Sequence, residues 1–160
     1  MIIQPEGPGG YTIFSDDVRY EMGSKLTYVG VYGGDMIVGA EPPVTLSQLC
    51  VTIAYRDSPE GLAEQAPYFR VVRITDDGSE ELARVDCDID FVADPLPPSS
   101  HTGGPESDYK IFSELRVQAR LAGFKLDGPC RIAVRAYKGE DEVRLGSLNV
   151  KFLPPETPGQ

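Results

Sequence analysis

Tryptophan is missing from this 160-residue chain, and histidine occurs once. His101, the single histidine, lies in a segment rich in Pro, Ser and Gly, so catalysis through an imidazole base has little support. No serine sits in a Gly-x-Ser-x-Gly turn, and the glycines of residues 7–10 lack the Gly-Lys-Ser/Thr ending of a phosphate loop. These absences favour a protein that is not an enzyme and has no cofactor. A hydrolase acting through carboxylates is kept as a residual alternative.

Cysteine is also scarce, with Cys50, Cys87 and Cys130 and no Cys-x-x-Cys pair. An odd number leaves at least one thiol unpaired, and all three lie in strand-like contexts, so we predict buried free thiols in a reducing compartment. Three thiols and one histidine do not make a convincing four-ligand zinc site. Residues 1–10 lack the basic and apolar regions of a signal peptide, and we expect a cytoplasmic protein.

Positive charge is outnumbered, with 15 Lys and Arg against 25 Asp and Glu and a net charge of −10. Such a chain repels nucleic-acid phosphates and anionic membrane surfaces. No apolar run approaches the roughly 20 residues that span a bilayer. We therefore expect neither nucleic acid nor membrane as a partner, and the acidity fits a protein partner or cations.

Long helical patterns are lacking too, whereas 17 glycines and 14 prolines turn the chain often. Alternating apolar and polar residues between the turns indicate eight or nine short strands. We predict an all-β fold, a two-sheet antiparallel β-sandwich of the immunoglobulin-like or C2-like kind, with a closed barrel as the structural alternative. One domain would span residues 11–153, between a flexible arm at 1–10 and a disordered tail at 154–160.

In the first third, we predict a strand over Tyr11–Ser15 and a polar connection over Asp16–Ser24. A second strand would span Leu26–Tyr32. A hairpin turn at Gly33–Asp35 would then lead to a short returning strand, Met36–Val38.

Further along, Leu46–Tyr55 is predicted as a strand and Asp57–Pro67 as a loop. The Asp-Asp-Gly-Ser turn at residues 76–79 predicts a hairpin between Tyr68–Thr75 and Glu81–Phe91, with Cys87 facing inward. Tyr109–Leu121 alternates as a strand but also contains good helix formers, so both remain open. Strands at 130–136 and 143–153 complete the prediction.

Five charged residues lie close together between two apolar segments, which is unusual in this chain: Asp16, Asp17, Arg19, Glu21 and Lys25. They are our candidate binding residues, forming a recognition surface at one end of the sandwich. In the competing interpretation, Arg19 forms a salt bridge with Asp17 or Glu21 and only orders the connection.

Asp86, Asp88 and Asp90 would share one face of a strand, and they are the candidate metal ligands for calcium. Strand neighbours two apart are separated by roughly 6.5–7 Å along the backbone, so three rigid positions converge poorly on one ion. The competing interpretation is an acidic face opposite arginines of a neighbouring strand, either Arg131 and Arg135 or Arg116 and Arg120.

The stretch FSDDVRYEMGSKLTYVGVYGGDMIV resembles a family of small bacterial and phage-associated proteins of unknown function. Their shared pattern is an Asp, an Arg and a Glu, a Gly-x-Lys turn, and a strand ending in Gly-x-Tyr or Gly-x-Phe. The matching positions here are Asp17, Arg19, Glu21, Gly23, Lys25, Gly30 and Tyr32. The resemblance supports the sandwich and implies no activity and no catalytic residue.

Together these features predict a non-enzymatic protein-interaction or structural module, encoded by a phage or prophage, with an unidentified protein as its partner. The alternative is a calcium-dependent binding module.

Overall fold

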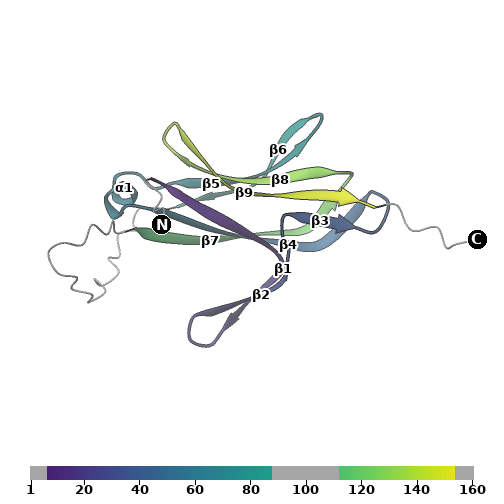
Figure 1. Ribbon diagram of the computed structural model, residues 1–160, viewed down its shortest axis with the longest axis horizontal. Coiled ribbons are helices and arrows are strands. Elements are labelled where there is room, and N and C mark those ends of the chain that lie inside the picture. Colours follow the sequence, from purple (N-terminus) through teal and green to yellow (C-terminus); the bar gives the residue numbers. More distant parts are fainter. Residues whose placement is uncertain (1–6, 88–111, 154–160) are drawn as a thin grey trace, which may run out of the picture.

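The structure is a computed structural model that describes residues 7–87 and 112–153. These residues form nine strands and one short helix. The strands lie in two sheets, one of four and one of five strands, which Figure 1 shows stacked as two layers. The predicted all-β sandwich is therefore confirmed, and the sheets do not close into a barrel.

The four-stranded sheet has the order β2-β1-β4-β7, and all its neighbours are antiparallel. Its strands are β1 (Gly9–Glu21), β2 (Lys25–Val31), β4 (Val44–Asp57) and β7 (Ser113–Leu126). The segment left open between strand and helix is thus a strand from Ser113 onward, because its alternation places one row against the core. The first strand begins at Gly9, within the predicted arm, whereas residues 1–6 and 154–160 lie outside the described part.

The five-stranded sheet has the order β3-β9-β8-β5-β6. Its strands are β3 (Asp35–Val38), β5 (Tyr68–Thr75), β6 (Gly78–Asp86), β8 (Cys130–Lys138) and β9 (Asp141–Phe152). The predicted hairpin around residues 76–79 is confirmed as the β5–β6 pair. Cys87 follows the end of β6 and packs against the core, as predicted, but it is only half-buried, as is Cys130, so the prediction of buried thiols holds fully for Cys50 alone.

The predicted return strand at Met36–Val38 exists but has a different partner. β3 does not pair with β2; it pairs in parallel with β9 of the other sheet. The chain crosses between the layers here. The backbone N–H of Asn149 donates to the backbone carbonyl of Gly34 at 2.8 Å. Met36 and Val38 are buried in the core by this crossing, which explains why the hairpin prediction failed.

The core lies between the two inner faces. Alternation in β4 places Leu49, Val51, Ile53 and Tyr55 inside, where all four are fully buried, as the sequence predicted. The inner face of the five-stranded sheet contributes buried residues from β5, β8 and β9. These are Phe69, Val71, Ile132, Val134, Ala136, Leu148 and Val150. The rings of Tyr55 and Phe69 meet edge to face with their centroids 5.7 Å apart, joining the layers.

The loop predicted after β4 contains the helix α1 (Pro59–Glu64). The Ser58 side chain caps it by accepting the Gly61 N–H at 3.0 Å, and Pro59 suits a first helical turn because it lacks an N–H. Leu62 is buried and anchors the helix at the end of the sandwich. Over the described ranges, no helix is long and apolar enough to cross a membrane.

Candidate functional site

The five charged residues of the candidate binding cluster lie on one β-hairpin. Asp16, Asp17, Arg19 and Glu21 belong to β1, and Lys25 is the first residue of β2. The predicted polar connection over Asp16–Ser24 was therefore wrong, since only residues 22–24 form the turn. Pairing with β2 satisfies the backbone of this charged stretch, so the strand continues where local polarity suggested a loop.

The β1–β2 hairpin has two different faces. Asp17, Arg19 and Glu21 alternate with Val18 and Tyr20. Val18 is only 2% exposed, because its side of the hairpin lies over the outer face of the four-stranded sheet. Two contacts with β7 hold it there: the Arg120 guanidinium donates to the Val18 carbonyl at 3.0 Å, and the Tyr20 hydroxyl donates to Gln118 Oε1 at 2.9 Å. Figure 1 shows the hairpin extending from the sandwich on the side away from the five-stranded sheet.

Asp17 fastens the base of the hairpin to β4. Its Oδ1 accepts the Val18 N–H at 2.9 Å and the Gln48 amide at 3.1 Å. The Val18 N–H is the main cause that lowers the pKa of Asp17, ahead of the effects of Gln48, Arg120 and Arg19. Arg19 Nε lies 3.6 Å from Asp17 Oδ2, and its side chain is 66% exposed. The predicted Arg19–Asp17 pair exists, but a pair this exposed contributes little to the hairpin's position.

A second lock involves Asp16, Gly30 and Tyr32. The Tyr32 hydroxyl donates to Asp16 Oδ1 at 2.5 Å. Partial burial and this carboxylate together raise the pKa of Tyr32 to about 12. Gly30 has a φ of +64°, and a Cβ on it would come within 2.0 Å of Asp16 Oδ2. Both Gly30 and Tyr32 belong to the pattern that carries the family resemblance, and here they hold the base of the hairpin.

Towards its tip the hairpin is open to solvent. Tyr20 is 72% exposed and Met22 is 93% exposed, and Glu21 makes one side-chain hydrogen bond, with Thr27 at 3.1 Å. Tyr11 and Val31 of the same two strands are also among the exposed large apolar side chains. The hairpin therefore combines a fixed base with a solvent-facing tip of mixed apolar and charged character.

Of the three candidate calcium ligands, the structure describes one, Asp86. Asp86 ends β6 and pairs with Arg84 of the same strand at 2.9 Å, while Asp88 and Asp90 lie outside the described ranges. The expected arginines of a neighbouring strand were the wrong ones, because β6 pairs with β5 and places Asp86 opposite Tyr68. Within residues 7–87 and 112–153, no group of three or more His, Cys, Asp or Glu could hold a metal ion.

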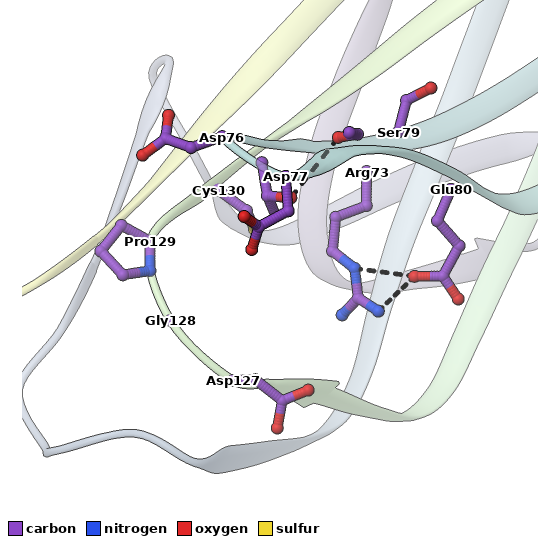
Figure 2. A pocket seen from close by; sticks show the side chains of 11 residues that line it. Arg73, Asp76, Asp77, Ser79, Glu80, Asp127, Gly128, Pro129 and Cys130 are labelled. Atoms are coloured by element: carbon purple, nitrogen blue, oxygen red, sulfur yellow. Dashed lines mark hydrogen bonds and ion pairs between the residues drawn. The ribbon is translucent and has the colours of Figure 1, made fainter.

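A pocket of about 530 Å³ opens at the end of the sandwich between the β5–β6 turn and the β7–β8 turn (Figure 2). Arg73 lies beside it, bonded to Glu80 and donating to the Lys125 carbonyl at 2.9 Å. The carboxylates of Asp76, Asp77 and Asp127 surround the opening.

Cys130 also lines this pocket. Burial raises the pKa of its thiol, although the nearby Arg73 opposes the shift. A thiol kept protonated at neutral pH is a poor nucleophile. Sequence reasoning missed the pocket. The turn at residues 76–79 was predicted, but nothing in the sequence indicated that it meets the turn at residues 128–129 at one end of the sandwich.

Comparisons with protein-family models, with curated proteins and with solved structures found no match to this chain.

Proposed function

We infer that the protein is a non-enzymatic protein-interaction module that binds its partner through the β1–β2 hairpin. One observation carries this proposal: Tyr20 and Met22 remain 72% and 93% exposed on a hairpin whose base is firmly bonded to the sheet. Tyrosine and methionine are enriched at protein interfaces, and a pre-ordered element loses little conformational entropy on binding. The adjacent charges of Arg19, Glu21 and Lys25 would form the polar rim.

Two further features of the chain bear on where this module acts. The three free cysteines favour the cytoplasm, where thiols stay reduced. The resemblance of residues 14–38 to phage-associated proteins extends the proposal to a phage- or prophage-encoded protein that acts on a protein of its host or its virion.

The test compares three forms of the full chain as bait in host lysate, with the captured proteins quantified by mass spectrometry. In the first variant Tyr20→Ser and Met22→Ser remove the apolar tip. In the control variant Ile37→Ser and Leu153→Ser remove two other exposed apolar side chains, which are 52% and 53% exposed and lie elsewhere on the surface.

We expect a set of proteins that wild type and control capture and that the hairpin variant loses. Far-ultraviolet circular dichroism and Tm would show that all three forms are folded. Equal capture by the three forms would place the binding surface outside the hairpin and refute the proposal.

A further inference from the structure

A second surface, distinct from the hairpin, is the free edge of β7. Among the described residues, β7 is the last strand of the four-stranded sheet and pairs only with β4, in an unbroken register from Ser113 to Ala122. β6 of the other sheet contacts it without forming a ladder. In the part of the chain that the structure describes, no strand bonds to its outer edge. An unpaired edge offers a row of N–H and C=O groups to another strand.

The side chains along this edge are of two kinds. Leu115, Val117 and Leu121 pack against the core but are only partly buried. On the opposite face lie Glu114, Arg116, Gln118 and Arg120, of which Glu114 and Arg116 form an ion pair at 2.7 Å. Natural edge strands are commonly protected by charged side chains, bulges or kinks. β7 carries charges on its outer face, but in the described residues its backbone departs from an extended strand only near its end, where Gly123 has a φ of +59°.

We propose that two copies of this chain associate through their β7 edges, pairing antiparallel about a two-fold axis at Val117. The two four-stranded sheets would then form one continuous sheet of about eight strands, a common way to satisfy a free edge. The half-buried Val117 would face its own copy, and Leu115 would face Ala119, so the apolar row gains cover on both sides of the axis.

The charge pattern of β7 selects this register. Backbone groups that point outward alternate along a strand, so a two-fold axis must pass through a residue position. With the axis at Val117, Glu114 faces Arg120 of the second copy twice, and Arg116 faces Gln118. Opposite charges directly across a strand pair are stabilising.

The neighbouring registers are worse. An axis at Gln118 places Arg116 opposite Arg120 twice, and an axis at Arg116 places two copies of Arg116 opposite each other; like charges directly across are destabilising. An axis at Ala119 creates no pair of opposite charges. An axis at Leu115 also places Glu114 opposite Arg116 twice, but it overlaps only residues 113–117 of the described strand. Among the registers compared, Val117 is therefore the one that combines two pairs of opposite charges with an overlap longer than five residues.

The experiment measures the mass of the full chain by sedimentation equilibrium over a range of concentrations. We expect wild type to be a concentration-dependent dimer. Glu114→Arg or Arg120→Glu reverses the charge of one side of both cross-strand pairs, and each should raise the dimer dissociation constant by roughly tenfold to a few hundredfold.

The decisive arm mixes the two single variants. One variant then carries two arginines and the other two glutamates at these positions, so both pairs are restored in a heterodimer. The double variant Glu114→Arg/Arg120→Glu should dimerise as wild type does. Arg84→Glu, on β6 at the edge of the five-stranded sheet as described, is the matched control and should leave the dimer intact.

Several results would overturn the proposal: a wild-type chain that stays monomeric, single variants that dimerise normally, or a mixture that forms no heterodimer. Arg120 also contacts the hairpin through the Val18 carbonyl, so circular dichroism and Tm must show that Arg120→Glu is folded. Glu114→Arg removes no contact of the hairpin in the described residues, so a loss of dimerisation in this variant cannot come from a displaced hairpin. If dimerisation is lost and partner capture is intact, the hairpin proposal stands. If partner capture is lost and dimerisation is intact, the dimer proposal stands.

Discussion

The buried ion pair between Asp57 and Lys138 provides the sharpest test of how the two sheets are held together. Asp57 ends β4 in one sheet, and Lys138 ends β8 in the other. Their Oδ2 and Nζ atoms are 2.8 Å apart, and the two side chains are 7% and 19% exposed. We predict that Lys138→Met destabilises the protein, because it leaves the carboxylate without its cation.

The expected loss follows from what remains around the carboxylate. Asp57 Oδ1 keeps the Ser58 N–H at 2.7 Å, and Oδ2 keeps a long contact of 3.5 Å from the Tyr55 hydroxyl. Breaking a fully buried pair costs about 3–5 kcal/mol. Since the carboxylate retains donors and water reaches the ammonium side, we expect about 2–3 kcal/mol here. For a chain of this size that corresponds to a Tm lower by about 4–12 °C.

The assay is urea denaturation followed by circular dichroism, with thermal unfolding as a second measure. Lys125→Met is the matched control, because Lys125 and Asp127 form a pair of similar length, 3.0 Å, but with side chains 61% and 63% exposed. That control should change the free energy of unfolding by less than about 1 kcal/mol.

A double-mutant cycle isolates the pair. If the interaction is real, Asp57→Asn combined with Lys138→Met should cost clearly less than the sum of the two single losses. Equal losses for Lys138→Met and Lys125→Met, or strict additivity in the cycle, would refute the reasoning that this pair stabilises the packing of the sheets.

Three further predictions concern the hairpin and the sheet edges. Gly30→Ala should lower Tm clearly more than Gly23→Ala, since both glycines have positive φ but only at Gly30 would the new Cβ collide with a carboxylate; equal shifts would contradict the lock at the hairpin base. The pKa of Asp35 is lowered, chiefly by the hydrogen bond from the Lys151 ammonium on β9. The ionised Asp35 carboxylate therefore stabilises the fold at pH values above its unfolded pKa, and this stabilisation is lost as pH falls through the folded pKa. The Tm difference between wild type and Asp35→Asn should therefore become smaller as pH falls from about 6 to about 3, a range that spans the ordinary pKa of an Asp carboxyl. A constant difference would contradict this role of Asp35. Arg70→Ala should lower the free energy of unfolding in urea more than Arg19→Ala does. Arg70 bonds to Glu81 and lies 5.7 Å from the Tyr137 ring centroid, whereas Arg19 is largely solvated. The reverse order would indicate that the Arg19 salt bridge does hold the hairpin in place.

Local pattern was sufficient for much of the sandwich. Leu49, Val51, Ile53 and Tyr55 alternate with the period of two that a strand requires. This pattern alone predicted that all four side chains are buried, and they are. The Asp-Asp-Gly-Ser turn specifies a two-residue hairpin through its own backbone preferences. Signals of this kind depend on neighbours in the sequence, so they can be read without knowing the rest of the fold.

The charged hairpin could not be predicted in the same way. Its residues were recognised as unusual, but they were assigned to a loop because polarity between apolar segments is typical of a connection. The strand persists through Asp16–Glu21 because β2 pairs with it and because Gln48 of β4 and Arg120 of β7 bond to its base. The last of these contacts lies about a hundred residues away in the chain, and no local pattern reports it.

The sequence by itself therefore determined the strand periodicity, the turns, the core rows and the acidic surface, all of which depend on spacing and composition. Only the tertiary structure decided which strands became neighbours: the parallel β3–β9 pair, the β1–β2 hairpin bonded to β7 over the outer face of the four-stranded sheet, and the edge of β7 that no described strand covers. The physical reason is that strand pairing is chosen by long-range burial and backbone hydrogen bonding, in which many partners have similar local propensity.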